Sequence, residues 1–170
     1  MELAEPIPRP PARLLVVDDD LGLLRLIQSR LKREKFDVVA VSSGREALQA
    51  VETGAFTLLL LDLKLPDFSA GELIREFTKI RPDLPFVVIT GQGDERVAVE
   101  MMLEGALDYL VKDAEFLDVL PARVRRAVDH VEQKERLARA EAALRREHAF
   151  RGRWTGNNRR CTREPARRPG

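Results

Sequence analysis

The chain has 170 residues, enough for one α/β domain and an extension, and its composition (44% hydrophobic, 34% charged) is that of an ordinary soluble protein. The net charge of +1 conceals an asymmetry, because residues 151–170 contain seven arginines and one acid, a net +6 that leaves −5 for residues 1–150. An acidic folded part argues against nucleic acid as a partner, and the longest wholly apolar run, Leu58–Leu61, is far too short to cross a membrane.

From Leu14 onward, short apolar runs alternate with amphipathic segments. In chain order, the predicted elements are a strand at Leu14–Val17, a helix capped by Asp20, a strand at Val38–Val41, a helix capped by Ser43 and ended by Gly54, a strand at Leu58–Leu61, a helix at 70–80, a strand at Phe86–Ile89, a helix at 94–104, a strand at Leu107–Val111 and a helix from Glu115 to about Phe150. The helix at 94–104 is expected to turn Val97, Met101 and Met102 inward.

Five strands that alternate with five helices predict an α/β fold in which helices cover both faces of a parallel sheet. Right-handed crossovers leave few topologies, of which the flavodoxin-like (βα)5 doubly wound order 2-1-3-4-5 is a common one. The last predicted helix is longer than such a domain needs, so the fold is expected to carry an extended C-terminal helix.

The predicted organisation is a disordered proline-rich leader at 1–12, a folded domain at 13–130, a helical extension at 131–150 and a basic disordered tail at 151–170. The leader carries acids and is not expected to be a secretory signal. The single cysteine, Cys161, cannot form an internal disulfide, which favours a reducing compartment and hence the cytoplasm.

The extension has two readings that the sequence leaves open. Leu137 and Leu144 lie seven residues apart with Ala140 between them, a heptad pattern that is short but typical of a dimerising coiled coil. A solvated charged helix accounts for the same residues. We therefore carry forward a homodimer through this helix as one of two alternatives.

Polar residues follow the predicted strands at the edge where ligands bind in open parallel sheets. Asp18 and Asp19 follow the first strand, Asp62 the third, Thr90 the fourth and Lys112 the fifth. If the first and third strands are neighbours, the three carboxylates meet, and their mutual repulsion favours a hard cation such as Mg²⁺ or Mn²⁺.

Such a cluster is suited to phosphoryl transfer. A carboxylate can attack phosphorus and form an aspartyl-phosphate, a reaction that needs positioning and neutralised phosphoryl oxygens more than acid–base groups. A cation, the Lys112 ammonium and the Thr90 hydroxyl could each engage a phosphoryl oxygen. Asp62 is then the predicted nucleophile.

Four stretches in this order resemble the receiver domain of response regulators in two-component phosphorelay systems: residues 14–20 (LLVVDDD), 59–66 (LLLDLKLP), 88–91 (VITG) and 105–112 (GALDYLVK). Seven positions match residues with roles in that family: Asp18 and Asp19 the metal-binding pair, Asp62 the phosphoacceptor, Lys64 the backbone carbonyl that completes the metal shell, Thr90 and Tyr109 the switch pair, and Lys112 the lysine that pairs with phosphate.

The resemblance implies a signalling protein and not a dedicated enzyme. Its donor would be a sensor histidine kinase or a phosphotransfer protein, and its output face the fourth helix, fifth strand and fifth helix. Asp113 stands where the family usually has a cis-proline after the lysine, so a trans bond is expected there. This departure supports the alternative, an unphosphorylated pseudo-receiver that acts as a dimerisation scaffold.

Overall fold

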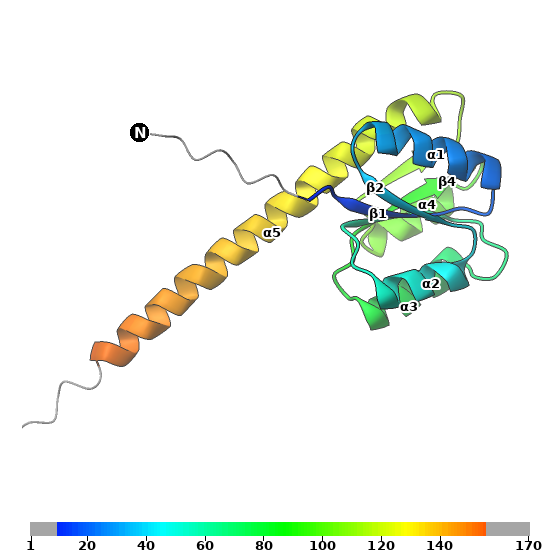
Figure 1. Cartoon of the computed structure of the whole chain (residues 1–170). Coiled ribbons are helices and arrows are strands. Elements are labelled where there is room, and N and C mark those ends of the chain that lie inside the picture. The colour runs from blue at the N-terminus through cyan, green and yellow to red at the C-terminus, as the bar shows by residue number, and fades with distance from the viewer. Residues whose placement is uncertain (1–9, 156–170) are drawn as a thin grey trace, which may run out of the picture. The chain divides into compact units, whose positions relative to one another are not determined.

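The computed structural model describes residues 10–155, with side chains as far as residue 149, and it is built around a five-stranded parallel sheet (Figure 1). The strands are β1 (Arg13–Val17), β2 (Asp37–Val41), β3 (Leu58–Asp62), β4 (Phe86–Thr90) and β5 (Asp108–Val111). They lie in the order β2-β1-β3-β4-β5, which confirms the predicted flavodoxin-like topology. Each observed strand agrees with its predicted run to within one residue at either end.

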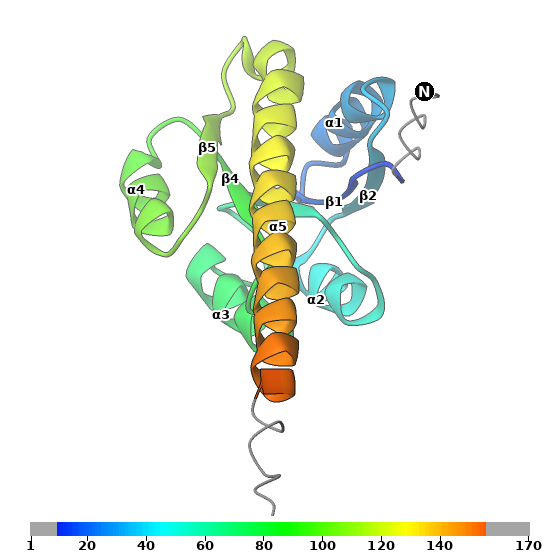
Figure 2. The same ribbon diagram turned by 90° about the vertical axis from the view of Figure 1, so that its left-hand side faces the viewer.

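Helices cover both faces of this sheet (Figures 1 and 2). They are α1 (Leu21–Arg33), α2 (Gly44–Thr53), α3 (Ala70–Ile80), α4 (Glu95–Leu103) and α5 (Phe116–Thr155). The apolar residues of α1 and of the first turns of α5 pack on one face, and those of α2, α3 and α4 pack on the other.

The central strand β3 explains why these strands appear in the sequence as continuous apolar runs. Leu58 and Leu60 point into one core, and Leu59 and Leu61 point into the other, so every leucine of the run is buried. Burial of a leucine side chain contributes about 1.5–3 kcal/mol. The sheet therefore gives a rigid base to the residues at its carboxyl edge.

At the N-termini of α1, α2 and α3, the side chain of the N-cap residue accepts a hydrogen bond from a backbone N–H of the first turn. Asp20 accepts a hydrogen bond from the Leu23 backbone N–H (3.0 Å), as predicted, and Ser43 accepts one from that of Glu46 (3.2 Å). At α3, Ser69 and Glu72 form a reciprocal capping box.

The start of α2 is also bound by a residue from a distant loop. The Asp67 carboxylate accepts hydrogen bonds from the backbone N–H groups of Gly44 (3.0 Å) and Arg45 (2.9 Å). Gly44 packs against Phe68, and a Cβ at this position would lie only 2.6 Å from the Phe68 ring. Residues 67 and 68 thus attach the loop after β3 to the first turn of α2.

The predicted inward face of α4 is wrong in part. Met101 is buried, but Val97 and Met102 are 37% and 39% exposed, and Ala98 is the second buried residue. Apolar residues occur almost all round this nine-residue helix, so the sequence pattern does not determine its rotation. The small Ala98 side chain allows the helix to approach the sheet closely.

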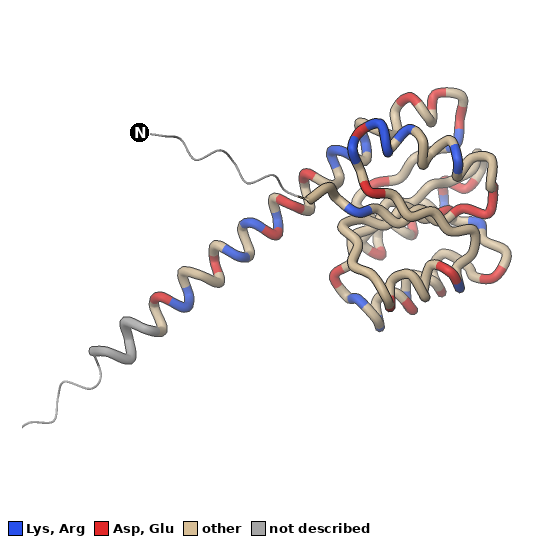
Figure 3. Tube along the Cα trace, in the orientation of Figure 1, with Lys and Arg blue, Asp and Glu red and all other residues tan. Residues whose placement is uncertain are grey.

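Helix α5 continues to Thr155 instead of ending near Phe150, and it takes part in two compact units. The first unit ends at Val131, and the second begins at Glu132. Basic and acidic residues are interspersed along the coloured part of α5 (Figure 3). No helix of the described residues is long and apolar enough to cross a membrane. The predictions for residues 1–9 and 156–170 lie outside the part described.

Candidate functional site

The predicted site residues lie together at the carboxyl edge of the sheet. Asp18 follows β1 and Asp62 ends β3, and these strands pair directly, with Val17 opposite Leu61. Asp18, Asp62 and Thr90 are buried, with exposed fractions of 0%, 3% and 1%. They are the fully buried polar side chains among the described residues.

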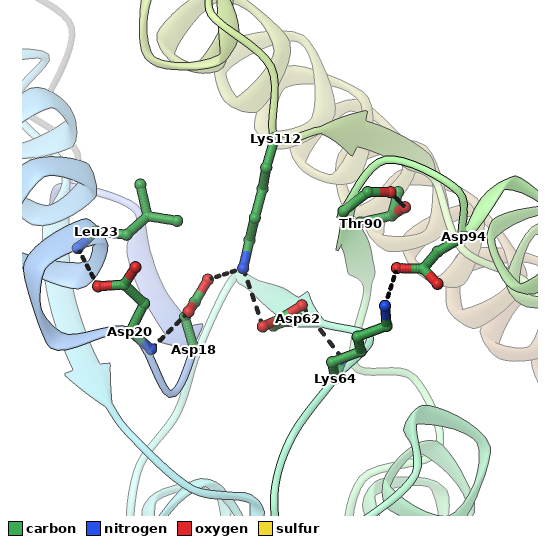
Figure 4. Close-up of polar contacts among 9 residues, drawn as sticks. Asp18, Asp20, Leu23, Asp62, Lys64, Thr90, Asp94 and Lys112 are labelled. Atoms are coloured by element: carbon green, nitrogen blue, oxygen red, sulfur yellow. Dashed lines mark hydrogen bonds and ion pairs between the residues drawn. The ribbon is translucent and has the colours of Figure 1, made fainter.

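The Lys112 ammonium lies between the two buried carboxylates (Figure 4). Its Nζ is 2.7 Å from Asp18 Oδ2 and 3.0 Å from Asp62 Oδ2. The second oxygen of each carboxylate accepts a backbone N–H, Asp18 Oδ1 from Asp20 (2.9 Å) and Asp62 Oδ1 from Lys64 (3.2 Å). These contacts fix the orientation of both carboxylates.

Burial and charge act in opposite directions on the site. Burial raises the pKa of Asp62, the negative charge of Asp18 raises it further, and the hydrogen bonds from Lys112 and the Lys64 N–H offset this only in part. Burial by itself lowers the pKa of Lys112, but its bonds to Asp18 and Asp62 outweigh burial and raise that pKa. The ammonium therefore stays charged at neutral pH.

The site has the oxygen ligands and the negative charge to hold a divalent cation. Oxygen atoms of Asp18, Asp19 and Asp62 all lie within 4.8 Å of one another, and Asp19 is exposed to solvent. Three carboxylates and one ammonium have a formal charge of −2, which a divalent cation would neutralise. An all-oxygen set of few carboxylates, open to water on one side, suits Mg²⁺.

Of the two predicted switch residues, Thr90 lies at the carboxyl end of β4 with the other site residues, whereas Tyr109 lies within β5, opposite Val88. The Thr90 hydroxyl donates to the Gly91 carbonyl (2.7 Å), so it is directed at the main chain of the following loop (Figure 4). Tyr109, in β5, is 41% exposed, and its carbonyl accepts a hydrogen bond from Arg123 (3.2 Å). The described residues contain no cis peptide bond, so the bond between Lys112 and Asp113 is trans, as expected.

Sequence reasoning missed one contact of the site. Lys64 was expected to contribute only its backbone carbonyl, but its side chain forms an ion pair with Asp94, Nζ to Oδ2 2.9 Å (Figure 4). The two residues lie on different loops, after β3 and before α4. Two opposite charges thirty positions apart give no signal in the sequence, because only the fold brings their loops together.

An open parallel α/β sheet with an aspartate cluster and a lysine at its carboxyl edge defines the class of protein. Residues 14–125 match the family model of the response regulator receiver domain, and the chain belongs to this family. Receiver domains are signalling modules of two-component systems that interact with histidine kinases and phosphotransfer proteins, and they bind Mg²⁺ at an acidic pocket.

Similar proteins agree with this assignment. The chain is 33% identical over 117 residues to the transcriptional regulatory protein ZraR of Escherichia coli (strain K12), covering 69% of this chain and 26% of that protein. It is 32% identical over 133 residues to the C4-dicarboxylate transport transcriptional regulatory protein DctD of Rhizobium meliloti, covering 78% and 28%. The chain thus spans about a quarter of the length of these curated relatives.

Among solved structures, a CheY-like response regulator receiver domain protein from Methanospirillum hungatei JF-1 superposes with a TM-score of 0.66 at 30% identity. The match covers 73% of this chain and 98% of that one. Because the superposition covers nearly all of that domain, the receiver fold accounts for most of the described residues of this chain.

Proposed function

We propose that this receiver accepts a phosphoryl group on Asp62 and passes the signal on through a change at α4, β5 and α5. The observation that carries the proposal is the shared Lys112 ammonium, which lies within 3.0 Å of both Asp18 and Asp62. This geometry places a fixed positive charge beside the carboxylate that would attack phosphorus. A histidine kinase or a phosphotransfer protein of the same system would supply the group.

In the proposed reaction, an Asp62 carboxylate oxygen forms a bond to phosphorus as the bond to the donor nitrogen breaks. The electron pair of that bond leaves with the donor imidazole. Lys112 neutralises one phosphoryl oxygen, and the Thr90 hydroxyl leaves the Gly91 carbonyl to donate to another. Asp18, Asp19, Asp62 and the Lys64 carbonyl would hold Mg²⁺ or Mn²⁺, which supplies further charge neutralisation at the phosphoryl group.

The movement of the Thr90 side chain would couple phosphorylation at Asp62 to the surface of α4, β5 and α5. Thr90 lies opposite Val111 of β5, and we expect the exposed Tyr109 of the same strand to turn inward when Thr90 moves and so to alter the surface of α4, β5 and α5. We also propose that the receiver domain spans residues 13–130 of the chain.

A cytoplasmic location is supported by the single cysteine, which cannot form an internal disulfide.

The experiment that tests the proposal is incubation of the protein with acetyl phosphate and Mg²⁺, followed by intact-mass measurement. We expect the mass of one phosphoryl group to be added, and the addition to fail in excess chelator. Mg²⁺ alone should also raise the melting temperature, because a ligand that binds only the folded state stabilises it by mass action. A folded protein that shows neither effect would be the pseudo-receiver scaffold instead.

The second unit supports a homodimer through α5. Leu137 and Leu144 are 60% and 57% exposed, and if both occupy the first position of a heptad, Arg136 of one copy faces Glu141 of the other in a parallel pair. This complementary charge favours the coiled coil over the solvated helix.

Aspartate at both Leu137 and Leu144 should halve the mass of the protein in solution, because it places charges in the apolar contact between the helices. Light scattering would measure this. The matched control is aspartate at Ala138 and Ala142, which adds the same charge on the outward side of the heptad and should leave the mass unchanged. A monomeric parent protein would exclude the dimer.

A further inference from the structure

The carboxylate of Asp94 occupies the N-cap position of α4 but does not cap the helix. At α1, α2 and α3 the N-cap side chain accepts a hydrogen bond from a backbone N–H of the first turn. Asp94 has a suitable side chain for this, and its carbonyl already accepts the Ala98 N–H (3.0 Å). Its ψ is 18°, whereas the capping residues of α1, α2 and α3 have extended ψ values of 100°, 158° and 153°, so its backbone must turn before its carboxylate can cap. Its carboxylate instead contacts the Lys64 ammonium at 2.9 Å (Figure 4).

The Asp94 carboxylate is folded back toward the site. A Cβ at Gly91 would lie 3.3 Å from Asp94 Oδ2, so the carboxylate passes directly over the residue whose carbonyl accepts the Thr90 hydroxyl. The Asp94 side chain is 15% exposed, whereas that of Lys64 is 71% exposed. The ion pair therefore fastens the loop between β4 and α4 to the loop that follows the phosphoacceptor.

The two positions open to the Asp94 carboxylate differ in polar partner and in the ψ of Asp94, and the two interactions themselves are of similar strength. An ion pair that includes a well-exposed lysine contributes little to stability. An N-cap hydrogen bond contributes a comparable or slightly larger amount. A modest change in the electrostatic surroundings of Lys64 can therefore shift Asp94 from one partner to the other.

Phosphorylation of Asp62 would make such a change, because it replaces the single charge of the carboxylate by about two negative charges on the phosphoryl group. Asp18, Asp19 and the phosphoryl group would then carry four negative charges, against three positive charges of Lys112 and a divalent cation. The remaining negative charge lies two residues from Lys64 and attracts its ammonium away from Asp94.

We propose that the Lys64–Asp94 ion pair is a latch that a phosphoryl group on Asp62 opens, freeing the Asp94 carboxylate to cap α4. The inference rests on the proposed function and adds to it a route from the site to α4. In the unphosphorylated protein the first turn of α4 lacks a side-chain cap; in the phosphorylated protein it gains one. Lys64 and Asp94 are positioning residues in this mechanism.

The test is amide hydrogen exchange at Arg96 and Val97, the N–H groups that an N-cap carboxylate binds. Lys64→Gln should slow exchange at one of them about fivefold without any phosphoryl group, the factor expected for a typical cap. The matched control is Lys79→Gln, which removes an ion pair of α3 (Lys79–Glu76, 2.6 Å) whose lysine is as exposed as Lys64 (69% against 71%), and it should change neither amide. Unchanged exchange in Lys64→Gln would overturn the latch.

Phosphorylated samples, checked by mass, complete the experiment. Phosphorylation should slow the same amide in the wild type but not in Asp94→Ala, which can neither pair nor cap. Asp94→Asn, which keeps Lys64 and can still cap, should show slow exchange in both states. An adduct that leaves the wild-type amides unchanged contradicts the latch alone, whereas absence of an adduct contradicts the proposed function.

Discussion

Asp62→Asn should abolish phosphoryl incorporation from acetyl phosphate and leave a fold at least as stable as that of the wild type. Lys112 and the Lys64 N–H bind different oxygens of the carboxylate, Oδ2 at 3.0 Å and Oδ1 at 3.2 Å, so the single amide oxygen of asparagine can accept only one of these two hydrogen bonds. That oxygen is also too poor a nucleophile to attack phosphorus. Intact mass after incubation with the donor and Mg²⁺ measures the loss.

The stability of this variant follows from the raised pKa of Asp62, which is caused mainly by burial. The folded state binds this proton more tightly than the unfolded chain does, so its contribution to stability is fully present below the unfolded-state pKa and is lost as pH rises through the folded-state pKa. At neutral pH without metal, the ionised carboxylate destabilises the fold, and Asp62→Asn removes this cost.

Urea unfolding in chelator, followed from acidic to neutral pH, measures the predicted pH dependence. The wild type should lose stability relative to Asp62→Asn as pH rises. Asp83→Asn, which changes an exposed aspartate in the turn before β4, is the control and should follow the wild type in both mass and stability. A phosphoryl adduct on Asp62→Asn would show that another residue is the acceptor.

Lys112→Met should slow phosphoryl incorporation by about 10²–10³-fold, the range for loss of one charge-stabilising donor. It should also destabilise the metal-free protein by about 2 kcal/mol, because two buried carboxylates lose their shared partner. This figure is below that for a fully buried pair because the Lys112 side chain is 22% exposed. The time course of intact mass and urea unfolding in chelator measure the two effects.

Mg²⁺ should separate the two roles of Lys112. A cation at Asp18, Asp19 and Asp62 replaces the missing positive charge, so Mg²⁺ should restore most of the stability of Lys112→Met. It cannot replace an ammonium that contacts a phosphoryl oxygen, so the rate should stay low. Lys79→Met, at an exposed ion pair of α3, should alter neither property. A normal rate in Lys112→Met would exclude a role for this lysine in the transfer.

The sheet and the acidic cluster could be predicted from the sequence because each depends on local signals. Strands buried on both faces appear as continuous apolar runs, and the residue after each run lies at the carboxyl edge once the strand order is known. Asp18, Asp62 and Lys112 were therefore placed together without coordinates. The rotation of α4 was not predictable, because its apolar residues surround the helix.

Long-range polar contacts could not be predicted from the sequence, for a different reason. Lys64 with Asp94, and Asp67 with the N–H groups of Gly44 and Arg45, join loops that only the finished fold brings together. Most charged residues in any protein are exposed and form no specific contact, so the presence of an acid or a base in the sequence does not identify a partner for it. The orientation of the Thr90 hydroxyl likewise depends on the conformation of the following loop.

The attachment of Asp67 and Phe68 to the start of α2 has a consequence for how the domain responds to its signal. The loop that follows Asp62 is held on the α2 side by the two hydrogen bonds that Asp67 accepts and by Phe68, which packs against Gly44 so closely that a Cβ there would lie 2.6 Å from its ring. Toward α4 the same loop is joined by a single ion pair with an exposed lysine. If Asp62 is phosphorylated as proposed, we therefore expect this loop to move on its α4 side while Asp67 and Phe68 hold it in place at α2.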